Sequence, residues 1–281
     1  MSHVQMTMKE RVLCVLKYLF LALCVCLALF PILWVIMSSF KTNAEILSNG
    51  MALPKSFSFV GYRDALTISP ILSYFGHSAS ITVISTALNV LFLAMASYVF
   101  ARCRFRGRDA LYFLLSLAMV IPMTALLHPV YSVVQALGLY DTKAVLILVY
   151  TALNLPMSLL ILRGTFASIP KALEEAAYVD GAGFVRTFFQ IMMPCAKGDL
   201  TSAAVLAFLQ SWNEFTFALV LTSGEEARTL PLSLSYFTAQ FSFNYTALFA
   251  AVTIAVIPSI VIFAVFQVQV VSSLTAGSVK E

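Results

Sequence analysis

The sequence predicts an all-α membrane protein with six transmembrane helices and with both termini on the cytoplasmic side. Three observations predict this: a high apolar content, six long apolar stretches, and an uneven distribution of lysine and arginine. Apolar residues make up 60% of the 281 residues and charged residues 11%, whereas an average soluble domain is about 25% charged. The composition argues against a disordered chain, a nucleic-acid binder with basic patches and an ordinary soluble enzyme.

Six apolar stretches are long enough to cross a bilayer, because a membrane helix needs about 17–25 residues. The first is too long for the apolar region of a signal peptide, and we interpret it as an uncleaved helix. Several stretches contain proline, which kinks a helix by removing a backbone hydrogen bond. The six are residues 16–38, 74–100, 110–133, 143–163, 199–222 and 245–267.

Lysine and arginine set the orientation, because cytoplasmic loops of membrane proteins carry an excess of them. With the N-terminus inside, most of the 17 Lys and Arg residues fall on the cytoplasmic side. The strongest marker is the run from Arg102 to Arg108, which we interpret as a flank that fixes orientation and has no other role. Two long outer segments follow, residues 39–73, with one short helix near 62–66, and residues 223–244.

We therefore expect three parts along the chain. Residues 1–73 form an N-terminal segment with the first helix and an outer loop, and residues 74–270 form a core with five helices. Residues 271–281 form a cytoplasmic tail.

The cytoplasmic segment of residues 165–197 differs from a simple connector. Ser168 and Pro170 are helix-start signals, and Glu174 and Glu175 lie near the positive N-terminal end of the helix that follows. Glycines at 181 and 183 permit a sharp turn, and a second helix with an apolar face ends at Pro194. The pattern predicts an amphipathic helix-turn-helix at the cytoplasmic face. Periodicity alone leaves open an interfacial helix that rests only on lipid headgroups.

A spaced motif in this segment resembles the EAA signature of ABC-importer permeases. Met193 stands where the signature usually has leucine, a change that conserves volume. The matching residues are Glu175, Ala176, Ala177, Gly181, Ile191 and Pro194. Further short segments resemble the carbohydrate branch of this family. Within that branch, the chain is similar to the MalG-type subunit. The segments are residues 40–42, 54–59, 138–142, 212–215 and 274–280.

The resemblance implies a MetI-like permease fold in the bacterial cytoplasmic membrane. It also implies a second, MalF-like permease subunit, two ABC ATPase subunits and an extracytoplasmic sugar-binding protein as partners. Residues 165–197 would be the coupling loop, which docks on an ATPase and moves the helices when ATP binds. The residues expected in this contact are Glu174, Glu175, Ala176, Ala177, Asp180, Gly181, Ile191 and Pro194. In the tail, the resemblance implies that Thr275, Ala276 and Gly277 also contact the ATPases.

Polar residues inside the expected spans either line a pathway or subunit interface, or hydrogen-bond neighbouring helices. Glu214 stands out, because a carboxylate within a span must face the bundle interior or a cavity. The resemblance favours a structural or gate-proximal role for it. The set consists of Ser78, Thr82, Ser85, Asn89, Asn154, Asn213 and Glu214.

The function predicted is ATP-driven import of a carbohydrate by alternating access. The sequence contains no phosphate-binding G-x-x-x-x-G-K-[ST] motif, so ATP hydrolysis is expected on a partner chain. We expect no cofactor, metal site or nucleic-acid partner in this chain. A glycerol 3-phosphate or polyol permease of the same branch remains an alternative, and a proton-coupled secondary transporter using Glu214 is a more distant one.

Overall fold

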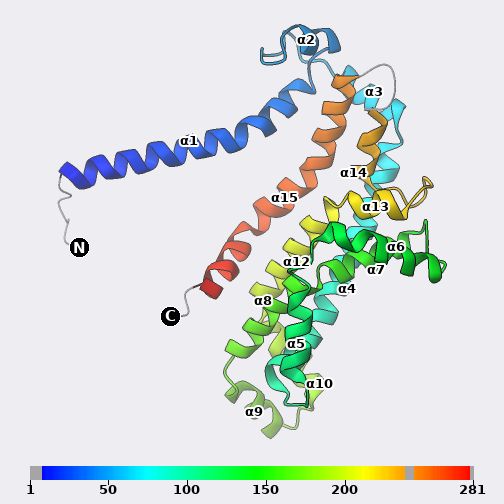
Figure 1. The fold of residues 1–281 in the computed structure, drawn as a ribbon. Coiled ribbons are helices and arrows are strands. Elements are labelled where there is room, and N and C mark those ends of the chain that lie inside the picture. The colour runs from blue at the N-terminus through cyan, green and yellow to red at the C-terminus, as the bar shows by residue number, and fades with distance from the viewer. Residues whose placement is uncertain (1–7, 238–243, 279–281) are drawn as a thin grey trace. The chain divides into compact units, whose positions relative to one another are not determined.

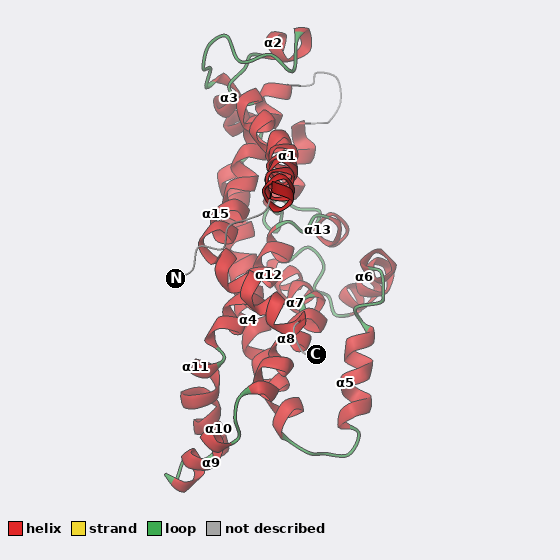
Figure 2. Cartoon of the chain, turned by 90° about the vertical axis from the view of Figure 1, so that its left-hand side faces the viewer, coloured by secondary structure: helices red, strands yellow, loops and turns green. Residues whose placement is uncertain are grey.

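The computed structural model describes residues 8–237 and 244–278, without the side chains of residues 10 and 273–278. The described part of the chain is helical and contains no strand, as Figure 2 shows. It divides into two compact units. One contains residues 1–69 and 234–254, and the other contains residues 70–233 and 255–281.

The first unit is built from α1 (Met8–Ser38), α2 (Asn43–Ser48), α3 (Val60–Ile68), the 3-10 turn η3 (Leu234–Phe237) and the start of α15 (Tyr245–Ser278). Trp34 of α1 packs edge-on against Phe249 of α15, with ring centroids 5.1 Å apart. The α3 helix confirms the short helix expected near 62–66. The α2 helix was not predicted, although its capping box of Thr42 and Glu45 was visible in the sequence.

The second unit contains the remaining helices (Figure 1). In chain order they are α4 (Ile71–Arg102), α5 (Arg108–Leu117), η1 (Met123–Leu126), α6 (Leu127–Ala136), α7 (Lys143–Leu153), α8 (Leu155–Ser168), α9 (Ala172–Val179), α10 (Phe184–Thr187), η2 (Phe188–Met192), α11 (Met193–Cys195), α12 (Lys197–Trp212), α13 (Thr216–Leu221), α14 (Leu230–Ser233) and the rest of α15.

The long helix α4 is the centre of this unit, and it contacts α7, α8, α12 and α14. Its C-terminal half packs against α8 and α12 through a buried cluster that includes Leu93, Tyr98, Leu162 and Phe166. A second buried cluster, with Ile81, Val149, Tyr150 and Phe217, joins α4 to α7 and α13. Small residues such as Ala203 and Ala207 on α12 allow this close packing.

The structure supports the six expected membrane helices only in part. Within the described residues, three helices are long and apolar enough to cross a membrane: Arg11–Ser38, Ile71–Arg102 and Tyr245–Ser272. Two bent pairs pass the same test together. Lys143–Leu153 with Leu155–Ser168 is bent by 47°, and Phe184–Cys195 with Lys197–Trp212 is bent by 80°.

Three of the expected spans are therefore broken. Residues 110–133 are divided among α5, η1 and α6, with Pro122 at the break, where it caps η1. Residues 143–163 bend at Asn154, two residues before Pro156. Within residues 199–222, helix α12 ends at Trp212 and helix α13 begins at Thr216. Apolar length predicted a crossing in each case, but hydropathy does not register a proline or a side chain that competes for backbone hydrogen bonds.

The substitution Gly61→Ala tests the packing of the first unit. A Cβ atom at Gly61 would lie 2.7 Å from the carbonyl oxygen of Thr246, so α3 and α15 would have to separate. We expect a loss of about 1–3 kcal/mol of stability, measured as a lower melting temperature in detergent. Gly76→Ala is the matched control, because no atom lies within 4 Å of a Cβ placed there. An unchanged melting temperature for Gly61→Ala would contradict the close contact.

Candidate functional site

The predicted coupling loop forms a helical hairpin at one end of the second unit (Figure 1). Helix α9 ends in a Schellman motif, in which Gly181 has φ of +79° and the N–H of Ala182 donates to the carbonyl of Ala177 at 2.9 Å. Gly181 is therefore the turn glycine, as predicted. Gly183 has an extended backbone instead and precedes α10.

The return arm of the hairpin differs from the prediction at Pro194. The sequence predicted that Pro194 stops the second helix, whereas the helical path continues through it to Cys195 and bends by 80° before Lys197. The preceding turn, Phe188–Met192, is a π-helix. Its wider turn accommodates a proline, which lacks the N–H for a regular α-helical bond.

Helix α9 presents two different faces. Glu175 and Ala176 are exposed, whereas Glu174 and Ala177 are buried within the chain. The two alanines expected to admit a partner surface therefore point in different directions, and Ala176 is the exposed one. Asp180 and Pro194 are also exposed, and Ile191 is half-buried. The hairpin also exposes apolar side chains, namely Leu173, Val179, Phe184 and Val185.

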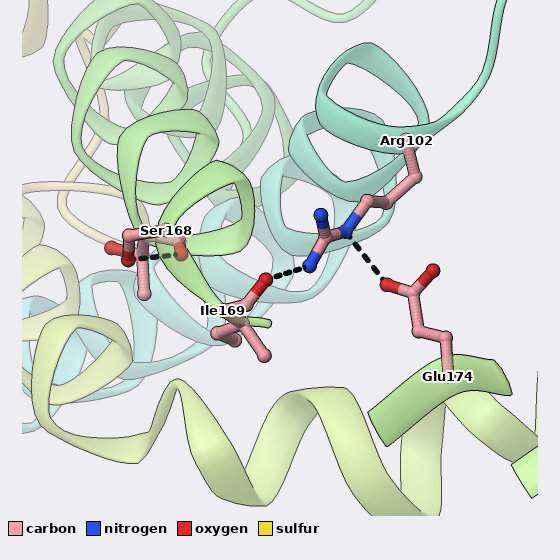
Figure 3. Close-up of polar contacts among 5 residues, drawn as sticks. Arg102, Ser168, Ile169 and Glu174 are labelled. Atoms are coloured by element: carbon pink, nitrogen blue, oxygen red, sulfur yellow. Dashed lines mark hydrogen bonds and ion pairs between the residues drawn. The ribbon is translucent and has the colours of Figure 1, made fainter. Parts of the chain in front are cut away.

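Arg102 contacts this loop, and this contact was not predicted from the sequence. Its Nε atom lies 2.7 Å from Oε1 of Glu174, and a terminal guanidinium nitrogen donates to the carbonyl of Ile169 (Figure 3). The run of arginines had been interpreted as an orientation flank without another role. Arg104 and Arg106, in the same run, are exposed. In the sequence, Arg102 differs from them only in its position at the end of the helix, directly before Cys103.

The polar residues of the expected spans are concentrated around the bend between α7 and α8. Nδ2 of Asn89 donates to the carbonyl of Thr151 at 2.9 Å, and the hydroxyl of Ser158 donates to Oδ1 of Asn89 at 2.6 Å. Nδ2 of Asn154 donates to the carbonyl of Tyr150 at 2.8 Å and to the hydroxyl of Ser211 at 3.0 Å. The bond from Asn89 reaches a carbonyl in the last turn of α7, and the Asn154 side chain adds a second bond to the Tyr150 carbonyl, which also accepts from the Asn154 N–H.

Two other buried positions of α4, Ser78 and Ser85, are also bonded to neighbouring segments. The hydroxyl of Ser78 accepts a 2.7 Å bond from the backbone N–H of Leu230, and the carbonyl of Ser85 accepts one from Thr151 at 3.3 Å. Thr82 is 1% exposed, and its carbonyl accepts from the Ser85 hydroxyl. All of these side chains face the interior of this chain, which favours the interhelix role over a pathway lining.

Glu214 lies at the break between α12 and α13. One carboxylate oxygen accepts from the N–H of Phe217 at 2.7 Å, and the other accepts from the N–H of Ala218 at 3.0 Å and from the hydroxyl of Tyr150 at 2.8 Å. The carboxylate therefore caps α13 and ties it to α7. Asn213, beside it, is exposed and hydrogen-bonds Leu209.

Asp141 joins the segment between α6 and α7 to the segment that follows α13. Its carboxylate accepts from the backbone N–H groups of Gly224 and Ser223, each at 2.9 Å from Oδ1. These bonds, those of Gly224 foremost, lower the pKa of Asp141 below its usual value. A cavity of about 640 Å³ lies here, and its polar lining includes His77, Lys143, Glu225 and Glu226.

A second cavity, of about 420 Å³, lies among α7, α8, α12 and the segment around η1. Its lining is mostly apolar, with methionines 119, 123 and 157, and Gln210 contributes a polar side chain. Among the described residues, no group of three or more His, Cys, Asp or Glu could hold a metal ion.

The tail contact predicted at Thr275, Ala276 and Gly277 involves residues in the last turns of α15, whose side chains lie outside the described residues. Part of the outer segment 223–244 also lies outside them.

Comparison with known proteins agrees with this architecture. Residues 93–275, which include the coupling loop, match the family described as the binding-protein-dependent transport system inner membrane component. The chain belongs to this family of ABC-transporter permeases. It is 34% identical to the diacetylchitobiose uptake system permease protein NgcG of Streptomyces coelicolor, with 90% of this chain and 85% of the relative covered.

Two further relatives are equally similar. The sulfoquinovosyl glycerol transport system permease of Agrobacterium fabrum is 34% identical, with 90% of this chain and 89% of the relative covered. The trehalose transport system permease of Mycobacterium tuberculosis is 34% identical, with 90% and 93% covered. In fold, the permease resembles a chain of a bacterial ABC transporter for alginate import, with a TM-score of 0.80, 23% identity, and 94% and 98% of the two chains covered.

Substitutions at Glu214 test its role as a cap. Glu214→Ala leaves the Tyr150 hydroxyl and two backbone N–H groups without this acceptor, so we expect a loss of about 2–3 kcal/mol of stability. Tyr150→Phe removes one of the three donors and is expected to cost about 1 kcal/mol. The measurement is the melting temperature in detergent, with exposed Thr216→Ala as a control. Equal melting temperatures for Glu214→Ala and Thr216→Ala would contradict the capping role.

The pH dependence of stability tests the Asp141 contact. Because the folded-state pKa lies below the unfolded value of about 4, the stabilisation is complete above that value and is lost as the pH falls through the folded pKa. Asn tolerates the positive φ of residue 141, so Asp141→Asn isolates the charge. We expect the permease to melt at a higher temperature than Asp141→Asn at pH 7, with the difference shrinking below about pH 4. A difference independent of pH would refute this, and Glu226→Gln is the control.

Proposed function

We propose that this permease is one transmembrane half of an ATP-driven importer that moves a carbohydrate across the cytoplasmic membrane by alternating access. The observation that carries the proposal is the exposed surface of α9, where Glu175 and Ala176 are exposed together with the apolar side chain of Val179, one turn after Glu175. This surface lies on a hairpin continuous with α8 and α12, so a force applied there reaches the bundle. A two-position element of this kind is what coupling requires.

The proposed topology has six crossings with both termini inside. Three long helices and two bent pairs supply five crossings, and α5, η1 and α6 together supply the sixth as a broken span. Broken helices are compatible with a bilayer where neighbouring helices satisfy the freed backbone groups. The bonds made by Asn89, Asn154 and Glu214 support this reading.

The proposed partners are a second, MalF-like permease subunit, two ATPase subunits and an extracytoplasmic sugar-binding protein. One structure of similar fold, with a TM-score of 0.61, is an alginate ABC transporter in complex with a periplasmic protein that holds alginate pentasaccharide. The tail at Thr275–Gly277 would add a second contact with the ATPases. ATP hydrolysis would occur on those subunits and not on this chain.

A carbohydrate is the proposed cargo because the relatives named above are uptake permeases for diacetylchitobiose, sulfoquinovosyl glycerol and trehalose. A glycerol 3-phosphate or polyol permease remains the alternative within the same branch. Proton-coupled transport through Glu214 fits less well, because its carboxylate already accepts three hydrogen bonds from within the chain.

The substitution Glu175→Lys tests the coupling surface in the reconstituted complex with its ATPase and binding protein. Charge reversal on the exposed face should weaken ATPase docking, and we expect sugar uptake to fall at least tenfold. Asp109→Lys is the control, because Asp109 is an exposed carboxylate of α5 outside the coupling loop. Uptake equal to that of the unaltered complex, with assembly intact, would overturn the assignment.

A further inference from the structure

Arg102 holds both sides of the bend that connects α8 to α9. Ile169 is the residue at which α8 ends, and Glu174 lies in the first turn of α9. The guanidinium donates to the carbonyl of the first and pairs with the carboxylate of the second. A planar guanidinium, with five N–H donors in a fixed arrangement, can make both contacts from one side chain.

The ion pair is shielded from solvent. The side chain of Arg102 is 7% exposed and that of Glu174 is 11% exposed. Screening by salt is therefore weak, and removing one partner leaves a buried charge without compensation. The contact is consequently more rigid than the exposed pair of Arg108 with Asp109, whose Asp109 side chain is 78% exposed.

An aromatic cluster reinforces the same junction. Tyr98 lies one turn before Arg102 on α4, and its ring centroid is 5.6 Å from that of Phe166 on α8. The centroids of Phe184 and Phe188, on the return arm, are 5.1 and 5.2 Å from that of Tyr98. The end of α4 is therefore packed against both arms of the coupling hairpin.

The opposite half of α4 is bonded to the outer side of the unit. Ser78 accepts a hydrogen bond from the N–H of Leu230, and His77 contacts the carbonyl of Arg228 at 3.2 Å. One continuous helix therefore connects the contacts at the coupling hairpin to the 228–230 segment.

We propose that Arg102 is a positioning residue that locks α9 to α4, so that a displacement of the Glu175 face moves α4 together with α8. This inference rests on the proposed function. The chain itself connects the hairpin to the bundle at Ser168, the last residue of α8, and at Lys197, the first residue of α12. The Arg102 contacts would add a non-covalent connection to these two and would give α4 a part in transmitting force to the outer side.

The test is the number of sugar molecules imported per ATP hydrolysed by the reconstituted complex. Arg102→Glu and Glu174→Arg each place like charges together, and each is expected to lower this ratio at least fivefold while binding-protein-stimulated ATP hydrolysis continues. The swap of both residues restores the ion pair but not the donor to the Ile169 carbonyl, so it should recover about a third to a half of the ratio. Arg104→Glu, a reversal at an exposed arginine of the same run, is the matched control and should leave it unchanged.

Two further variants keep the test decisive if a single reversal prevents assembly. Arg102→Lys retains the charge opposite Glu174 but cannot hold both partners, so its ratio should fall about twofold to threefold. Arg102→Met with Glu174→Leu retains the bulk without the charges and should assemble with a ratio at least fivefold lower. An unaltered ratio in either assembled variant, or a swap no better than the single reversals, would overturn the proposal.

The outcomes separate this inference from the proposed function. If Glu175→Lys abolishes uptake and the Arg102 variants keep a normal ratio, the coupling surface stands and the role of Arg102 is refuted. If Glu175→Lys has no effect on uptake, the coupling function itself fails.

Discussion

In a bilayer, every backbone polar group must find its partner within the protein, and this constraint governs the second unit of the permease. Its helices are interrupted near Pro122, Asn154 and Glu214, and each interruption frees carbonyl and N–H groups. Asn89 and Asn154 bond the carbonyls at the end of α7, and Glu214 bonds the N–H groups at the start of α13. At the breaks near Asn154 and Glu214, polar side chains therefore supply hydrogen-bond partners for the backbone.

The same constraint explains why the sequence predicted some features of the fold and not others. Hydropathy locates apolar segments, and residues 71–102 and 245–272 are single helices as expected. It does not distinguish a continuous span from a broken one, because Asn154 and Glu214 act partly through partners that are distant in sequence. Glu214, for example, also accepts a hydrogen bond from Tyr150, and Asn154 donates one to Ser211. The polar residues could be found from sequence, but their pairing required the fold.

The coupling hairpin was predictable in outline because its signals are local. Gly181 ends α9 in a left-handed conformation, and the glutamates lie in the first turn, where the helix dipole favours them. Which side of α9 each residue occupies was less predictable. Periodicity grouped Ala176 with Ala177, but the short α9 helix turns Ala177 and Glu174 inward against the chain. The π-helical turn before Pro194 also had no sequence signal that we could have used.

Arg102 shows how one residue can serve two requirements. A cationic residue at the end of α4 satisfies the charge asymmetry that orients a membrane helix, and this sufficed to explain it from sequence. The structure adds a buried pair with Glu174, which contributes little net stability because desolvation offsets most of the attraction. What such a pair provides is geometry, since a guanidinium bound to two partners permits few orientations. The exposed arginines of the same run meet the orientation requirement without this constraint, so the burial of Arg102 is explained by its contact with the hairpin.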